Sequence, residues 1–172
     1  MLEHDCDREA FRAVRLRPAT TEDETFLRQL FATTRADELS VMACDENQKE
    51  AFIAMQFNVQ KQQYAMSYPA AQHSLILSND VPIGRLLLDR GKLEFTLVDI
   101  ALLPVHRGDG IGTGLIRDIV QEAAAAGKPV RLHVLTSSAA KRLYERLGFL
   151  RVGGDAVYLE MKWVPSVRNS AE

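Results

Sequence analysis

Four glycines occupy every second position from 108 to 114, directly after Arg107. Glycine lets the backbone approach a ligand closely and adopt positive φ. Apolar residues at helical spacing follow, so these glycines stand at a helix N-terminus, where free N–H groups and the helix dipole favour an anion. A tight structural turn would explain one or two such glycines. Four of them after an arginine favour a phosphate site over a purely structural turn.

The spacing of this turn argues against two common nucleotide sites. A Walker loop ends in Gly-Lys-Ser/Thr, whereas Gly112 is followed by Thr113 and Gly114. A dinucleotide fingerprint has another glycine spacing and needs an acidic residue at the end of the next strand, where this chain has Leu135 and Thr136.

Carboxylates on an apolar strand are a second kind of candidate. Asp99 interrupts the apolar run 97–102, and Glu94 lies near the start of the same strand. Burying a carboxylate is costly without a partner, and desolvation makes a carboxylate a better base. A structural ion pair explains Asp99 equally well, and a solvated charge beside a turn is more typical of Glu94. His133, on the next strand, is expected to be a hydrogen-bonded core histidine.

A mixed sheet is expected to position these residues. Apolar runs at 74–77, 83–88 and 93–103, separated by turn residues, predict three antiparallel strands. The apolar spacing from residue 111 to residue 123 predicts a helix that ends at Gly127. Because the strand at 130–135 follows that helix, it should run parallel to the strand before it.

Further elements complete an α/β fold. A short strand at 14–17 and a helix with Phe26, Leu27, Leu30 and Phe31 come first. A second helix is expected from Asp45 to Tyr64. Its apolar stripe is assigned to Phe52, Met55, Phe57 and Val59, and its glutamines (Gln56, Gln60, Gln62 and Gln63) are expected to be solvated. A last helix, capped by Ser137 or Ser138 and closed by Gly148, precedes two terminal strands at 149–152 and 157–161.

Two motifs on these elements resemble those of the GNAT acetyltransferases. Residues 102–112 are similar to the family's apolar strand end, proline and Arg/Gln-x-x-Gly-x-Gly/Ala turn. Residues 140–149 are similar to its Ala-x-x-x-Tyr-x-x-x-Gly-Phe ending. The order and spacing of the elements agree with the family from about residue 14 to residue 163. In one departure, Ser137 stands where the family often has asparagine, so an amide contact to the cofactor can be lost there.

The resemblance implies the GNAT acyl-CoA N-acyltransferase fold, with six to seven strands in a mixed sheet and about four helices. It implies acetyl-CoA, or another acyl-CoA, as the donor and no metal. The pantetheine would pair with the end of the strand at 93–103, and the turn would wrap the pyrophosphate. The side chain of Asp109 would face solvent, because a carboxylate repels phosphate. The implied cofactor residues are Ile100, Ala101, Leu102, Arg107, Gly108, Asp109, Gly110, Ile111, Gly112, Thr113, Ser137, Ala140 and Tyr144.

The same resemblance implies direct acetyl transfer to a primary amine in a ternary complex. A backbone N–H near Leu102 would polarise the thioester, and Tyr144 would protonate the departing thiolate. A packed core aromatic is the other interpretation of Tyr144. Asp99 or Glu94 would take the proton of the amine, or ordered water would do so. A non-catalytic acyl-CoA-binding regulatory module is the alternative function.

Composition limits the remaining expectations. A formal net charge of −2 argues against a general nucleic-acid binder, although a local basic patch would escape this argument. No apolar run reaches the ~20 residues that span a bilayer, and the start lacks a secretory pattern, so the cytoplasm is the expected location. Two cysteines are too few for a disulfide framework or a zinc cluster.

The chain length fits one domain. We expect a disordered N-terminus at 1–12, a single GNAT domain at 13–164 and a flexible tail at 165–172. The acceptor is expected to be a small molecule or a protein amine. A homodimer is compatible with the resemblance.

Overall fold

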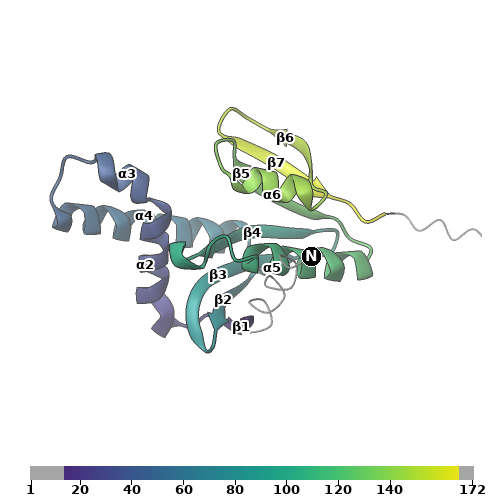
Figure 1. Ribbon diagram of the computed structural model, residues 1–172, viewed down its shortest axis with the longest axis horizontal. Helices are drawn as coiled ribbons and strands as arrows, with labels where there is room; N and C mark the ends of the chain where they lie inside the picture. Colours follow the sequence, from purple (N-terminus) through teal and green to yellow (C-terminus); the bar gives the residue numbers. More distant parts are fainter. Residues whose placement is uncertain (1–13, 167–172) are drawn as a thin grey trace, which may run out of the picture. The chain divides into compact units, whose positions relative to one another are not determined.

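The computed structural model describes residues 14–166, and the expectations for residues 1–12 and for residues 167–172 of the tail lie outside this range. Seven strands form one sheet in the order β1-β2-β3-β4-β5-β7-β6, which confirms the predicted mixed α/β fold (Figure 1). The strands are β1 (Val14–Pro18), β2 (Gln72–Ser78), β3 (Val81–Arg90), β4 (Phe95–Leu102), β5 (Val130–Leu135), β6 (Leu150–Gly154) and β7 (Tyr158–Trp163). The helices are α2 (Glu24–Thr34), α3 (Ala36–Val41), α4 (Glu46–Ser67), α5 (Ile111–Ala125) and α6 (Ala140–Arg146), with short 3₁₀ turns η1 (Thr21–Asp23) and η2 (Pro104–His106).

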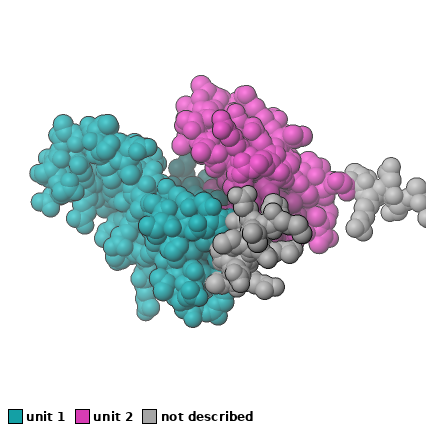
Figure 2. Space-filling model, in the orientation of Figure 1, with its two compact units in different colours: residues 1–87, 99–111 teal, residues 88–98, 112–172 magenta. Residues whose placement is uncertain are grey.

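The chain divides into two compact units (Figure 2). Unit 1 comprises residues 1–87 and 99–111, and unit 2 comprises residues 88–98 and 112–172. Strands β3 and β4 therefore each contribute residues to both units. A single domain at 13–164 stays a prediction.

In unit 1, α2 and α4 pack on the sheet. The rings of Phe31 and Phe57 lie 5.8 Å apart, within a buried cluster that includes Leu75 of β2. The predicted stripe on α4 was wrong in part, because Met55 and Val59 are more than half exposed while Ile53 and Phe57 are buried. The apolar residues of α4 are distributed over all of its faces. Its contact with α2, rather than its own periodicity, therefore decides which face is buried.

The predicted start of α4 is confirmed. Asp45 is its N-cap, and the Asp45 side chain accepts a hydrogen bond from the Gln48 amide while the Gln48 side chain accepts one from the Asp45 amide. This reciprocal capping box satisfies amides that have no partner within the helix.

In unit 2, β4 and β5 run parallel, with Phe95 opposite Val130, as the intervening helix predicted. Strand β7 pairs antiparallel with both β5 and β6. Helix α5 buries its apolar face and is followed by Gly127 at φ +64°, as expected of a residue that ends a helix. The expectation for His133 was wrong: it alternates away from the buried residues of β5 as predicted, but it is exposed.

Candidate functional site

The glycine turn joins η2 to α5. The N–H of Arg107 donates to the carbonyl of Pro104, which closes η2, and the backbone then passes through Gly108 at φ +88° and Gly110 at φ +77°. Both conformations are strained for any residue with a side chain. A Cβ at Gly108 would meet no heavy atom within 4 Å, so the backbone conformation rather than crowding requires glycine there. Helix α5 begins directly afterwards and presents its first amides, which suits a phosphate.

Arg107 is tied to the end of β4. Its Nε donates to the carbonyl of Leu102 at 2.9 Å, and its Nη2 donates to the Thr33 hydroxyl of α2 at 3.3 Å. The guanidinium therefore sits on the segment where the pantetheine was expected, and it remains exposed. It adds a positive charge to the start of the turn.

Gly84 of β3 brings two strands close together. A Cβ at this position would stand 2.3 Å from the carbonyl oxygen of Ala101 and 2.8 Å from a methyl of Leu102. Nearby, the N–H of Leu103 donates to the carbonyl of Ile83 at 2.8 Å. Only glycine permits this approach, which fixes the end of β4 against β3.

The second motif closes around Tyr144 in unit 2. Tyr144 is buried, with 7% of its surface exposed, and its ring packs edge-on against Phe149 at 5.7 Å between centroids. Gly148 ends the helical region at φ +89°, and the N–H of Phe149 returns to the carbonyl of Tyr144. The Gly-Phe pair thus holds the tyrosine in place. At the start of α6, Ser138 rather than Ser137 accepts a hydrogen bond from the Ala140 amide, and Ser137 is exposed.

The predicted cofactor residues fall on both units. Residues 100–102 and 107–111 belong to unit 1, whereas Gly112, Thr113, Ser137, Ala140 and Tyr144 belong to unit 2. Within unit 1, the glycine turn has the backbone geometry expected of a phosphate site, and within unit 2, Tyr144 is held by its packing on Phe149.

Asp99 of β4 forms a close ion pair with Arg85 of β3. The Arg85 Nε lies 2.6 Å from the Asp99 Oδ2, and the Nη2 contacts the same oxygen. The Arg85 Nη2 also donates to the Oε1 of Gln60 on α4 at 2.6 Å, and its guanidinium lies 5.9 Å from the ring of Tyr64. The expectation that Gln60 is solvated was therefore wrong, because the buried arginine needs acceptors. The ion pair foreseen for Asp99 is present.

Glu94 lies in a different charged cluster, in unit 2. Its carboxylate pairs with the Arg131 Nε at 2.8 Å and with the Lys162 Nζ at 3.0 Å. Burial raises the pKa of Glu94, but hydrogen bonds from Lys162 and Arg131 outweigh this effect and leave the pKa below its ordinary value. Arg131 also contacts Glu160. The two carboxylates of this strand region thus have separate partners.

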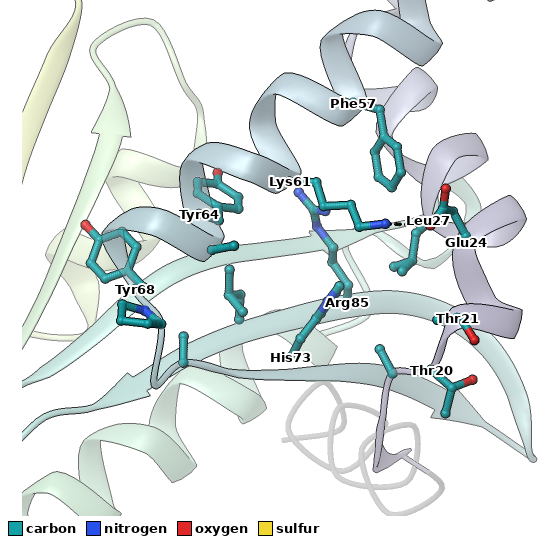
Figure 3. A pocket seen from close by; sticks show the side chains of 15 residues that line it. Thr20, Thr21, Glu24, Leu27, Phe57, Lys61, Tyr64, Tyr68, His73 and Arg85 are labelled. Carbon is teal, nitrogen blue, oxygen red and sulfur yellow. Dashed lines mark hydrogen bonds and ion pairs between the residues drawn. The ribbon is translucent and has the colours of Figure 1, made fainter.

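A cavity of about 580 Å³ lies within unit 1 (Figure 3). We call it the α4 cavity, because α4 supplies much of its wall; β2, β3 and the junction of β1 with α2 supply the rest. Phe57, Tyr64 and Tyr68 contribute aromatic rings to its wall. The lining comprises Ala19, Thr20, Thr21, Glu24, Leu27, Phe57, Lys61, Tyr64, Ala65, Tyr68, Pro69, Ala71, His73, Arg85 and Leu87.

Two polar residues of this lining, Lys61 and His73, were not foreseen from the sequence. Lys61 of α4 points to Glu24 of α2, and their charged atoms lie 2.6 Å apart (Figure 3). His73 of β2 has a buried Nε2 to which the described residues offer no hydrogen bond. Burial, followed by the charge of Arg85, lowers the pKa of His73. The signal for Arg85 was in the sequence: an arginine inside the run 83–88 faces an aspartate inside the run 97–102.

Membrane-spanning helices and metal-binding clusters are both absent from the described residues. None of the helices within residues 14–166 is long and apolar enough to cross a membrane. No group of three or more histidine, cysteine, aspartate or glutamate side chains in the same range could hold a metal ion.

Residues 70–151 match the family model described as acetyltransferase (GNAT) domain. This segment contains the glycine turn, Asp99 and Tyr144. A comparison with curated proteins finds no match.

Solved structures share the fold. The PaiA N-acetyltransferase of Thermoplasma acidophilum, solved in complex with coenzyme A, aligns with a TM-score of 0.63 at 19% identity, covering 88% of this chain and 98% of that one. The putative acetyltransferase YncA of Salmonella typhimurium, solved with its cofactor acetyl-CoA, aligns at 0.54 and 17% identity, covering 93% and 98%. Naa50 of Arabidopsis thaliana, in complex with the bisubstrate analogue CoA-Ac-MVNAL, aligns at 0.58 and 16% identity, covering 88% and 98%. The chain thus contains a segment that matches the GNAT acetyltransferase domain, carries both motifs that resemble the family's, and shares the fold of solved N-acetyltransferases.

Proposed function

We propose that this protein transfers the acetyl group of acetyl-CoA to a primary amine, directly and within a ternary complex. The observation that carries the proposal is the turn at the start of α5, where Gly108 and Gly110 hold positive φ inside the matched GNAT domain. Such a turn at a helix N-terminus suits a pyrophosphate. The bisubstrate analogue bound to Naa50 joins coenzyme A to an acceptor peptide, which supports direct transfer in this fold.

The donor is held by backbone more than by side chains. The end of β4, at residues 100–102, pairs with the pantetheine, and the amides from Arg107 to Thr113 receive the pyrophosphate. Arg107 adds charge to this site and Asp109 contributes its backbone only. Ser137, in the segment that leads into α6, and Ala140, the first residue of α6, are assigned to the donor as well. An N–H near Leu102 stabilises the negative charge that develops on the thioester oxygen.

The chemistry needs one proton removed and one returned. An alkyl ammonium, with a pKa of roughly 10, must lose a proton before its nitrogen can attack the acetyl carbon. Asp99 takes this proton, because its Oδ2 alone faces Arg85 and its Oδ1 receives no hydrogen bond among the described residues. The C–N bond then forms and the C–S bond breaks. Tyr144 protonates the departing sulfur and regains its proton from the nitrogen of the new amide through solvent, and Asp99 releases its own proton to solvent.

Glu94 is the second candidate for the base. Its oxygens are already engaged by Arg131 and Lys162, so it is the less suitable proton acceptor of the two. Ordered water is the third route for this proton.

Two measurements test the function. Acetyl-CoA should raise the melting temperature more than ATP or GTP does, and release of the coenzyme A thiol over a panel of amines should depend on enzyme. Gly110→Asp should abolish the stabilisation by acetyl-CoA, because it adds bulk, backbone strain and a like charge beside the pyrophosphate. Retained stabilisation in Gly110→Asp would refute the phosphate site. Stabilisation without thiol release on any amine would instead support a non-catalytic acyl-CoA-binding module.

A further inference from the structure

The charges that line the α4 cavity are unusual for a site that binds amines. Lys61 and Arg85 are cations, while Glu24 is the single acid in the lining and is already paired with Lys61. His73 adds no charge near neutral pH, because burial and Arg85 lower its pKa. A polyamine or another polycation would therefore meet like charge in this cavity. An acceptor that carries an anionic group in addition to its amine fits better.

Arg85 has an unused donor group. Its side chain is 9% exposed, and its contacts with Asp99 and Gln60 involve Nε and Nη2. The Nη1 atom has two N–H donors, and none of the described residues accepts a hydrogen bond from it. Because Asp99, Gln60 and the ring of Tyr64 already fix the guanidinium, a ligand would lose little entropy in ordering it.

A carboxylate is the group that this donor fits best. Guanidinium–carboxylate hydrogen bonds are short and strong, and they gain strength where water is excluded. Figure 3 shows Arg85 extending from its strand toward α4, among the side chains that line the cavity. Asp99 does not line the cavity, but its carboxylate is bound to the Arg85 guanidinium, so an ammonium next to the bound carboxylate would lie near it. The Arg85–Asp99 pair is thus complementary to a zwitterion.

The rest of the lining is suited to an apolar group. Leu27, Phe57 and Leu87 are buried residues of the wall, and the rings of Tyr64 and Tyr68 add aromatic surface. A volume of about 580 Å³ lies within the range of small-molecule sites. The wall therefore favours an aliphatic or aromatic side chain over a polar one.

We propose that the α4 cavity binds the acceptor, and that this acceptor is an α-amino acid with an apolar or aromatic side chain whose carboxylate is bound by Arg85. This inference rests on the proposed acetyl transfer, and it names the substrate class of that reaction. The transfer acetylates the α-amino nitrogen and releases the free thiol of coenzyme A.

The test compares amines that differ only in the carboxylate. L-Phenylalanine, L-phenylalaninamide and 2-phenylethylamine form one series; L-methionine and 3-(methylthio)propylamine form another; spermidine represents the polycations. Thiol release should give kcat/KM at least about tenfold higher for each amino acid than for its amide or decarboxylated relative, with spermidine lowest. Such a ratio is what the loss of one charge-assisted hydrogen bond produces.

Variants of Arg85 connect the selectivity to this residue. Arg85→Gln should remove the preference for the carboxylate, and Arg85→Lys should keep part of it because the charge remains. Arg90→Gln is the matched control, since Arg90 lies on the same strand but pairs with Glu122 of α5 and does not line the cavity. Because Arg85→Gln leaves Asp99 unpaired, the melting temperature of each variant is measured first.

Binding of products gives a readout that does not need turnover. N-Acetyl-L-phenylalanine should raise the melting temperature of the protein in the presence of coenzyme A, whereas N-(2-phenylethyl)acetamide should raise it less. If Arg85→Gln does not fold, the melting-temperature shifts that the two products cause are compared between Arg85→Lys and the native protein instead. Stabilisation by the carboxylate product without any thiol release would support the carboxylate site while refuting the proposed enzyme activity. Transfer with equal or greater efficiency to the amide, the decarboxylated amine or spermidine would overturn the inference and leave the proposed function intact.

Discussion

Two carboxylates near the same strand differ in what surrounds them. Asp99, in unit 1, and Glu94, in unit 2, have similarly covered side chains, with 22% and 27% exposed. Glu94 has two cationic partners, and one of them, Arg131, is shared with Glu160. Among residues 14–166, Asp99 has one ionic partner, Arg85, and this arginine lines a cavity. Exposure therefore does not separate the proposed base from the other carboxylate, whereas the number and the position of their partners do.

The largest effect is expected from Asp99→Asn. A positioned general base contributes on the order of a hundredfold or more, so kcat/KM at pH 7 should fall about 100-fold. The loss should shrink as the pH rises toward the pKa of the amine, because the acceptor then loses its proton without help. Glu94→Gln should stay within about twofold of the native enzyme. The measurement is a pH–rate profile of thiol release for the three proteins.

A deficit in Asp99→Asn that is constant across pH would change the assignment. It would mean that Asp99 positions Arg85 rather than accepting a proton. Equal losses in Asp99→Asn and Glu94→Gln would remove the distinction between the two carboxylates.

The next largest effect is expected from the loss of Tyr144, the proposed proton donor to the departing sulfur. Tyr144→Phe should lower turnover at least about tenfold while the affinity for acetyl-CoA stays within about twofold, because the ring still packs on Phe149. Single-turnover kinetics and a titration of acetyl-CoA separate the two quantities. Unchanged turnover would leave Tyr144 as a core aromatic, and the departing sulfur would then take its proton by another route.

Much of the fold followed from local signals in the sequence. The start of α4 came from the capping residue Asp45, and the parallel pairing of β4 with β5 came from the helix between them. The face of α4 did not follow, because Met55 and Val59 are as apolar as the buried Ile53 and Phe57. Only the tertiary contact with α2 decides which of these residues are buried and which are exposed.

The site was foreseen unevenly for a similar reason. The glycine turn and the Tyr-x-x-x-Gly-Phe motif are local in sequence, and both have the expected backbone geometry. Lys61, His73 and Gln60 line or support the cavity through contacts between distant segments, which no spacing reveals. Asp99 was identified but its partner was not chosen, since the register of β3 against β4 decides which cation it meets.

A smaller effect should appear in the stability of the Glu94 cluster. Glu94→Gln removes the acceptor shared by Arg131 and Lys162, and such a partly exposed cluster contributes about 1 kcal/mol. The pKa of Glu94 is lower in the folded chain, so this contribution is present above the unfolded pKa of about 4.3 and is lost as the pH falls through the folded value. Urea denaturation at several pH values should therefore show the native protein and the variant converging in acid. A constant difference would show that packing rather than charge stabilises the cluster.

The smallest effect is expected in the pH dependence of the unfolding free energy, through His73 of the α4 cavity. The pKa of His73 is lower in the folded chain than in the unfolded chain, where it is about 6.5, so the unfolded state binds more protons just below that pH. The native protein should lose stability as the pH falls below about 6.5, and His73→Asn should lack this slope. The slope of unfolding free energy between pH 5 and pH 7 measures it, with Glu94→Gln as the control that keeps the native slope. If His73→Asn keeps the slope as well, another group titrates in this window and the imidazole is not held neutral beside Arg85. If only His73→Asn loses it, the two regions have separate acid limits: the Glu94 cluster loses its contribution below about pH 4.3, and the α4 cavity is already destabilised near pH 6.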